Sequence, residues 1–114
     1  MSRAERAKEY FMQGYACSQA VALAFSDLTG LSEDQITKLC LPFGGGFGRQ
    51  RLVCGAVSGL SVIVGLLFAE SGVSAENKKL VYQIEQKLCA EFKAQTGSLI
   101  CNDLLLGVNL DFGT

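Results

Sequence analysis

Apolar residues recur at helical spacing along most of the chain, and no segment alternates apolar with polar residues as a half-buried strand would. The pattern is clearest after Ser74, where lysines and glutamates occupy one helix face and an apolar stripe the other: Leu80, Val81, Ile84, Leu88 and Phe92. We expect Ser74 to cap this amphipathic helix and Gly97 to end it. The hydrophobic pattern therefore predicts an all-α protein.

Caps, glycines and the single proline divide the rest of the chain into shorter helices. We predict helices over residues 2–13, 17–28, 32–40 and 98–106, and an irregular tail over 107–114. The third of these helices begins with a capping box, in which Ser32 is followed three residues later by Gln35, and it ends before Pro42. A glycine-dense loop follows over residues 43–51.

Residues 52–69 carry no charge, which raises the question of a membrane span. Small residues interrupt this stretch and its overall apolarity is modest: Gly55, Ser58, Gly59, Ser61 and Gly65. These features favour a central helix over residues 52–70 that is buried on all sides. We therefore expect a single-domain helical bundle of about five to six helices around this buried central helix.

Size and composition fit one domain over residues 1–114. The chain has a mass of 12.2 kDa, which is enough for one core. A hydrophobic fraction of 49% against 18% charged residues leaves much apolar area to cover, so we expect a homodimer. A net charge of -1 without a basic stripe argues against nucleic-acid binding. The polar, charged N-terminus lacks a signal-peptide pattern, so we expect a cytoplasmic protein without a membrane partner.

The candidate chemistry is concentrated in five cysteines, because the chain contains no histidine. The absence of histidine excludes an imidazole base, histidine ligands to haem or another metal, and the Glu-x-x-His diiron site of helical bundles. Cys17, Cys54 and Cys101 stand where predicted helices begin, and the exposed N–H groups and macrodipole there favour the thiolate. We therefore expect lowered pKa values for these three thiols. Cys40 and Cys89 are expected to pack as small apolar residues.

Two glycine-rich features near Cys54 have both a structural and a functional interpretation. The loop could present N–H groups and charge to an anion, although its spacing matches neither a Walker loop nor a dinucleotide-binding loop; the candidate residues are Gly44, Gly45, Gly46, Gly48 and Arg49. Gly55 and Gly59, four residues apart, leave a smooth helix face on which another helix can pack closely. That helix could belong to the same chain or to a second copy.

Together these segments resemble a family of small redox-active proteins named for a Cys … Gly-Cys-Ala-x-x-Gly … Cys … Cys pattern. The resemblance covers nearly the whole chain and runs through Cys17-Ser18-Gln19-Ala20-Val21, the loop glycines, Cys54-Gly55-Ala56-Val57-Ser58-Gly59 and residues 97–105. The first two residues of the central motif stand here in the opposite order. No cysteine follows Cys101, so Cys89 or Cys40 is the alternative fourth member. The resemblance implies a helical, cysteine-based redox or electron-transfer role, with a metal or iron–sulfur centre as one option.

The leading hypothesis is a redox protein in which Cys17, Cys54 and Cys101 converge. They would either exchange a disulfide with a redox partner protein or ligate an iron–sulfur cluster or another thiophilic metal. One alternative is a module that binds an anion or a partner helix through the glycine loop. The other is a structural dimerisation domain built on the face of Gly55 and Gly59.

Overall fold

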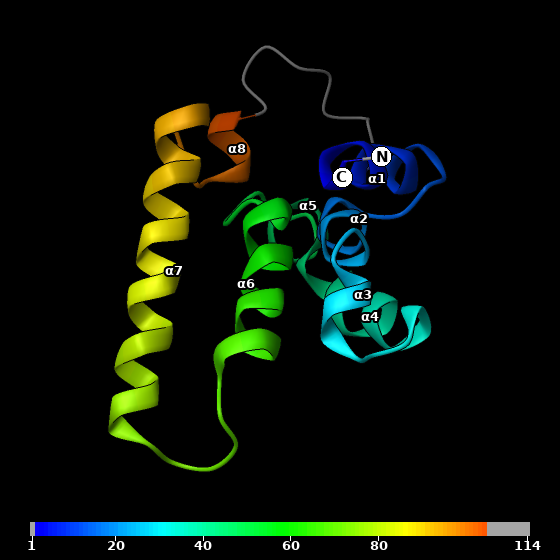
Figure 1. Ribbon diagram of the computed structural model, residues 1–114. Helices are drawn as coiled ribbons and strands as arrows, with labels where there is room; N and C mark the ends of the chain where they lie inside the picture. The colour runs from blue at the N-terminus through cyan, green and yellow to red at the C-terminus, as the bar shows by residue number, and fades with distance from the viewer. Residues whose placement is uncertain (1, 105–114) are drawn as a thin grey trace.

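The computed structural model describes residues 2–104 and is helical over most of that range (Figure 1). The elements are α1 (Arg3–Met12), α2 (Cys17–Leu23), α3 (Ser26–Thr29), α4 (Glu33–Cys40), the 3₁₀ helix η1 (Leu41–Phe43), α5 (Gly44–Phe47), α6 (Gly55–Phe68), α7 (Ala75–Thr96) and α8 (Cys101–Leu104). Over residues 2–104 no strand forms, which confirms the predicted all-α class. The tail predicted over residues 107–114 lies outside the described residues.

The caps read from the sequence set the boundaries of the longer helices. Ser32 and Gln35 form the expected capping box at the start of α4. The Ser74 hydroxyl accepts the N–H of Asn77 at the start of α7. Gly97 ends that helix in the left-handed region, at φ 95°, where glycine avoids the steric penalty of a Cβ.

Helix α6 lies between α7 on one side and α1 to α4 on the other (Figure 1). One face of α6 is buried, but Leu66, Leu67 and Phe68 at its end are exposed. The expected burial of the central helix on all sides is therefore wrong, and the helix is shorter than the predicted 52–70. Residues 52–54 are extended because they pair with residues 99–101. Among the described helices, none combines the length and apolarity that a membrane crossing requires.

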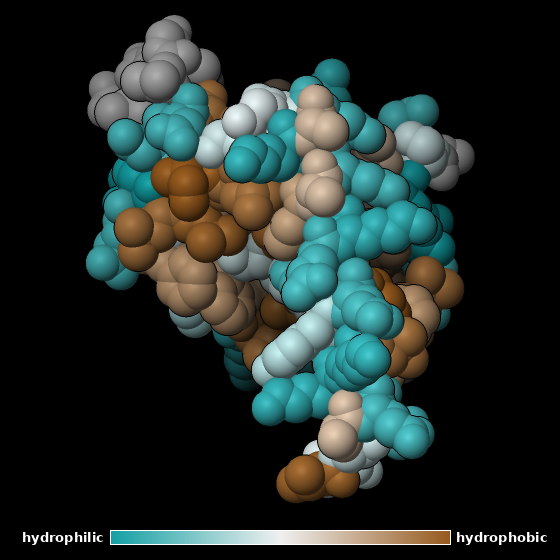
Figure 2. Space-filling view, turned by 90° about the vertical axis from the view of Figure 1, so that its left-hand side faces the viewer, coloured by the Kyte–Doolittle hydropathy of each residue, from teal (hydrophilic) through white to brown (hydrophobic). Residues whose placement is uncertain are grey.

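The main packing partner of α7 is α6. None of the residues of α7 is fully buried. Figure 2, which views the molecule from the α7 side, shows a hydrophilic band with apolar side chains on both sides of it. The predicted stripe faces α6 only in part, because Leu80 is 48% exposed. A polar contact also joins the two helices, since the Ser61 hydroxyl donates to the Glu85 carboxylate.

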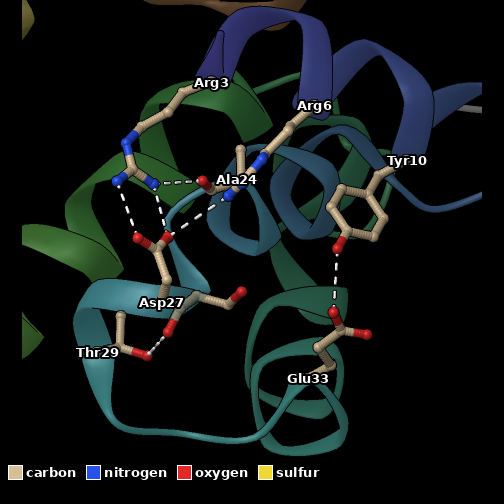
Figure 3. A network of polar contacts seen from close by, with 8 residues as sticks. Arg3, Arg6, Tyr10, Ala24, Asp27, Thr29 and Glu33 are labelled. Carbon is tan, nitrogen blue, oxygen red and sulfur yellow. Dashed lines mark hydrogen bonds and ion pairs between the residues drawn. The ribbon is translucent and has the colours of Figure 1, made fainter. Parts of the chain in front are cut away.

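The predicted helix over residues 17–28 is interrupted, and this expectation was wrong. Helix α2 ends at Leu23, and Phe25 leaves the helical region with φ −111° and ψ 10° before α3 begins. A contact with α1 explains the break. The Arg3 guanidinium donates a hydrogen bond to the Ala24 carbonyl oxygen at 2.7 Å and also binds the Asp27 carboxylate (Figure 3). The same guanidinium lies over the Phe25 ring. The long-range contact thus outweighs local helix propensity.

Helices α2 and α6 approach each other closely because the glycines of α6 carry no side chain. A Cβ at Gly59 would lie 2.5 Å from the Ser18 carbonyl oxygen, and a Cβ at Gly55 would overlap the Cys17 sulfur. Ser18 is itself fixed, since its hydroxyl donates to the Cys40 carbonyl oxygen at 2.7 Å. The face of Gly55 and Gly59 is therefore filled by α2 of the same chain. A dimer built on that face, one of the expected alternatives, would have to displace α2.

We predict that Gly59→Ala destabilises the protein by about 2 kcal/mol, because backbone atoms of Ser18 cannot yield to the added methyl group. The matched control is Gly65→Ala in the same helix, where no atom lies within 4 Å of the added Cβ. That variant should gain up to about 1 kcal/mol from the better helix propensity of alanine. Urea unfolding of both variants measures the two shifts, and equal shifts would contradict the close α2–α6 contact.

Candidate functional site: three thiols at helix starts

Cys54 and Cys101 are brought together by a short extended pairing between distant segments. Val53 and Ile100 form an isolated antiparallel bridge. One hydrogen bond flanks this bridge on each side. The Cys54 N–H donates to the Leu99 carbonyl oxygen (2.7 Å), and the Cys101 N–H donates to the Leu52 carbonyl oxygen (2.6 Å). Because side chains alternate along extended chains, Cys54 and Cys101 are diagonal neighbours on the face opposite the bridged pair.

Cys17 reaches the same place through helix packing. It is the first residue of α2, and its sulfur lies against Gly55, the residue after Cys54. Ionised Cys17 and ionised Cys101 would each act electrostatically on the Cys54 thiol. The structure therefore places Cys17 beside the residue that follows Cys54, and Cys101 diagonally across the bridge from Cys54. Each stands at a helix start, as the sequence predicted, with Cys54 as the N-cap of α6 and Cys101 as the first residue of α8.

The glycine loop makes room for these cysteines. At Gly46 a Cβ would lie 2.8 Å from the Cβ of Cys101 and 2.7 Å from the Leu52 amide nitrogen. At Gly44 a Cβ would lie 2.8 Å from the Cβ of Ala16, the residue before Cys17. Glycine is therefore required at both positions by close packing, and Gly46 also has a positive φ of 75°.

The same loop holds side chains in a strained backbone conformation. Phe47, Arg49 and Arg51 have φ values of 64°, 65° and 62°, a region that residues with a Cβ rarely adopt. Hydrogen bonds inside the loop hold this conformation: the N–H groups of Arg49, Arg51 and Leu52 donate to the carbonyl oxygens of Gly44, Gly45 and Gly46, respectively. These three amides are therefore not directed at an anion. Their use inside the loop favours a packing role for Gly44, Gly45 and Gly46, while Gly48 and Arg49 lie on the surface.

Arg51 was a candidate source of charge for anion binding by the loop, and its position beside a thiol was not predicted from the sequence. Its guanidinium lies 3.8 Å from the Cys101 sulfur, and its carbonyl oxygen accepts the N–H of Asn102. A signal was available in two similar triplets, Leu-Val-Cys at residues 52–54 and Leu-Ile-Cys at residues 99–101. Their β-branched centres favour extended backbone, so pairing of the two cysteine-bearing segments could have been anticipated.

The expected low pKa of Cys54 is wrong. Burial raises the pKa of its thiol, and the N–H groups of Ala56 and Val57 at the start of α6 oppose this effect without overcoming it. Negative charge on Cys17 or Cys101 raises the Cys54 pKa further. Desolvation of the thiolate therefore outweighs the favourable position at the helix start.

The remaining two cysteines lie in other surroundings. Cys40 is 0% exposed in a core cluster with Leu23, Ile36 and Ile63, so its expected packing role is confirmed. Cys89 is half-buried on α7, with its sulfur 3.8 Å from a carboxylate oxygen of Glu85. Burial, and then the charge of Glu85, raise the pKa of the Cys89 thiol.

A metal centre finds no support in the arrangement of the described side chains. All five cysteines are free thiols. Over residues 2–104, no group of three or more histidine, cysteine, aspartate or glutamate side chains is arranged to hold a metal ion. The described residues therefore do not fit an iron–sulfur cluster or another thiolate-bound metal as they stand.

We predict that Cys54 in the folded protein reacts slowly with iodoacetamide at neutral pH. The thiolate is the nucleophile, and a raised pKa leaves less of it at a given pH. The alkylation rate of Cys54 should still be rising at a pH where the same residue in the urea-unfolded chain has reached its plateau. Peptide mass mapping at a series of pH values measures both curves. A folded-state curve with the lower midpoint would refute the effect of burial.

Comparison with known proteins points to the same cysteines. Residues 15–112 match the model of the family described as "Putative redox-active protein (C_GCAxxG_C_C)". Searches of curated proteins and of solved structures each gave no match. The matched range contains Cys17, Cys54 and Cys101 together with the glycine loop. The chain therefore belongs to this family.

Proposed function

We propose that the protein is a thiol–disulfide redox protein in which Cys54 forms a reversible disulfide with Cys17 or Cys101. The observation that carries this proposal is the position of Cys54, diagonally across the bridge from Cys101 and one residue before the Gly55 that contacts the Cys17 sulfur, with the N–H groups of Ala56 and Val57 close to its thiol. Cys17 and Cys54 are partly accessible, whereas Cys101 is only 7% exposed. A partner can therefore reach the cluster from the side of Cys17 and Cys54.

The exchange needs no cofactor, since a protein disulfide serves as oxidant. The thiolate of one cysteine attacks a sulfur of the partner disulfide, whose S–S bond breaks and whose second sulfur leaves as a thiolate and takes up a proton. A second cysteine, having lost its proton, then attacks the mixed disulfide. This step forms the intrachain disulfide and releases the first partner sulfur as a thiol. Two electrons pass to the partner, which ends as a dithiol.

Electrostatics also favours a disulfide over three ionised thiols. Each neighbouring thiolate raises the Cys54 pKa, so charges on the three sulfurs oppose one another in a site that is already partly desolvated. A disulfide removes two of these ionisable groups. Ligation of an iron–sulfur cluster or another metal by Cys17, Cys54 and Cys101 stays a prediction, which metal analysis of anaerobically purified protein tests.

We predict that mild oxidation with glutathione disulfide forms one intrachain disulfide that contains Cys54. The oxidised protein should have lost two titratable thiols, and peptide mapping should link Cys54 to Cys17 or to Cys101. Cys54→Ser should abolish this bond. The matched control Cys89→Ser changes another half-buried thiol outside the cluster and should leave the bond intact.

The same experiment can overturn the proposal. Oxidised protein in which Cys54 remains a free thiol would exclude the assigned role. A disulfide that forms equally in Cys54→Ser would do the same. Bound iron or zinc that is retained by wild type and lost from Cys54→Ser would instead favour the metal alternative.

A further inference from the structure

We propose that the surface beside the three thiols docks an acidic protein segment, in which a disulfide is flanked by carboxylates and an apolar side chain. Three residues form this surface, which we call the thiol rim: Phe47, Arg49 and Leu52. Because the docking presupposes the disulfide exchange proposed above, it names the kind of partner that the exchange would use. Apolar contact, rigidity and charge each support the assignment.

Leu52 places an exposed apolar side chain beside the sulfurs. In the antiparallel bridge Leu52 lies directly opposite Cys101, and alternation puts its side chain on the face that carries Cys54 and Cys101. Its backbone is fully engaged, since its N–H donates to Gly46 and its carbonyl oxygen accepts from Cys101. Even so, the residue is 50% exposed. An apolar side chain held in this way next to the thiols offers apolar area to a partner that reaches the sulfurs.

Phe47 extends the apolar contact and is held rigidly. It follows Gly46, which packs against Cys101, and its ring meets the Phe43 ring edge to face with centroids 5.2 Å apart. It is nevertheless 42% exposed and has a strained, positive φ. Strain of this kind persists where the surroundings fix it and is frequent at binding sites. A fixed rim also loses little conformational entropy when a partner binds.

The charge around the rim selects an acidic partner. Residues 35–69 contain no aspartate or glutamate, in a chain whose net charge is -1, and Lys38 is paired with Asp34 outside that range. Residues 11–26, which contain Cys17, carry no charge at all. On the rim itself, Arg49 is exposed. The rim therefore carries the positive charge of Arg49, and carboxylates on a partner would be attracted to it.

The experiment compares the rates at which the reduced protein reduces three disulfide probes. Two are synthetic peptides with a single disulfide and one leucine, flanked either by glutamates or by lysines, and the third is hydroxyethyl disulfide. We expect the glutamate peptide to be reduced about tenfold faster than the lysine peptide at low salt, and the difference to shrink as salt screens the charges.

Variants of the rim separate docking from chemistry. Leu52→Ser and Arg49→Glu should each slow reduction of the glutamate peptide about tenfold, which is the effect of losing one well-placed contact. Neither should change the rate with hydroxyethyl disulfide, which is too small to span the rim. The matched control is Leu80→Ser, because Leu80 is 48% exposed on α7. Arg49→Glu changes an exposed side chain, so this variant is expected to fold. It therefore tests the docking surface even if Leu52→Ser does not fold.

Each outcome has a defined meaning. Equal rates for the two peptides, or equal losses in Leu52→Ser and Leu80→Ser, would overturn the docking surface while leaving the exchange chemistry in place. Wild-type protein that reduces none of the probes, hydroxyethyl disulfide included, would overturn the exchange chemistry and the docking together. A preference for the glutamate peptide that is lost in Arg49→Glu would establish the basic rim.

Discussion

The close approach of α2 to α6 is the constraint on which the rest of the structure depends. Gly55 and Gly59 let the backbone of Ser18 and the sulfur of Cys17 pack against α6, at a distance that any side chain would prevent. The same packing buries Ser18, whose hydroxyl ties α2 to the end of α4 at Cys40. One contact therefore organises the helical core and fixes the position of Cys17 beside Cys54. Stability and site geometry cannot be changed separately here.

Local sequence signals predicted the long helices, and long-range contacts account for most of the differences. The caps at Ser32, Ser74 and Gly97 act within one turn, so they can be read from the chain. The break after Leu23 arises from Arg3, which lies on α1, and the late start of α6 arises from pairing with residues 99–101. At the candidate site, the prediction that Cys17, Cys54 and Cys101 stand at helix starts could be made from the sequence. Their sequence positions could not show that burial raises the pKa of Cys54, because burial is a property of the packed core.

The raised pKa of Cys54 shapes how the proposed exchange would proceed. A helix start normally favours a thiolate, and here Ala56 and Val57 supply N–H groups for it, but desolvation has the larger effect. In the reduced protein the raised pKa thus biases Cys54 toward the neutral thiol and slows its alkylation. Reaction then requires that a partner approach closely enough to change the surroundings of the sulfur. A protein partner that docks on the proposed rim would meet this requirement, whereas a small disulfide reacts without changing those surroundings and therefore more slowly.

The order of residues in the central motif has a structural consequence in this chain. The family pattern places glycine before cysteine, whereas here Cys54 precedes Gly55. A cysteine at position 55 would have its Cβ in the space that the Cys17 sulfur occupies, so one of the two would have to move. With the cysteine at position 54, the residue instead forms the N-cap of α6 and lies diagonally across the bridge from Cys101. The exchanged order thus relieves crowding against Cys17 and gives Cys54 two neighbouring sulfurs, which is why we assign it the central position in the exchange.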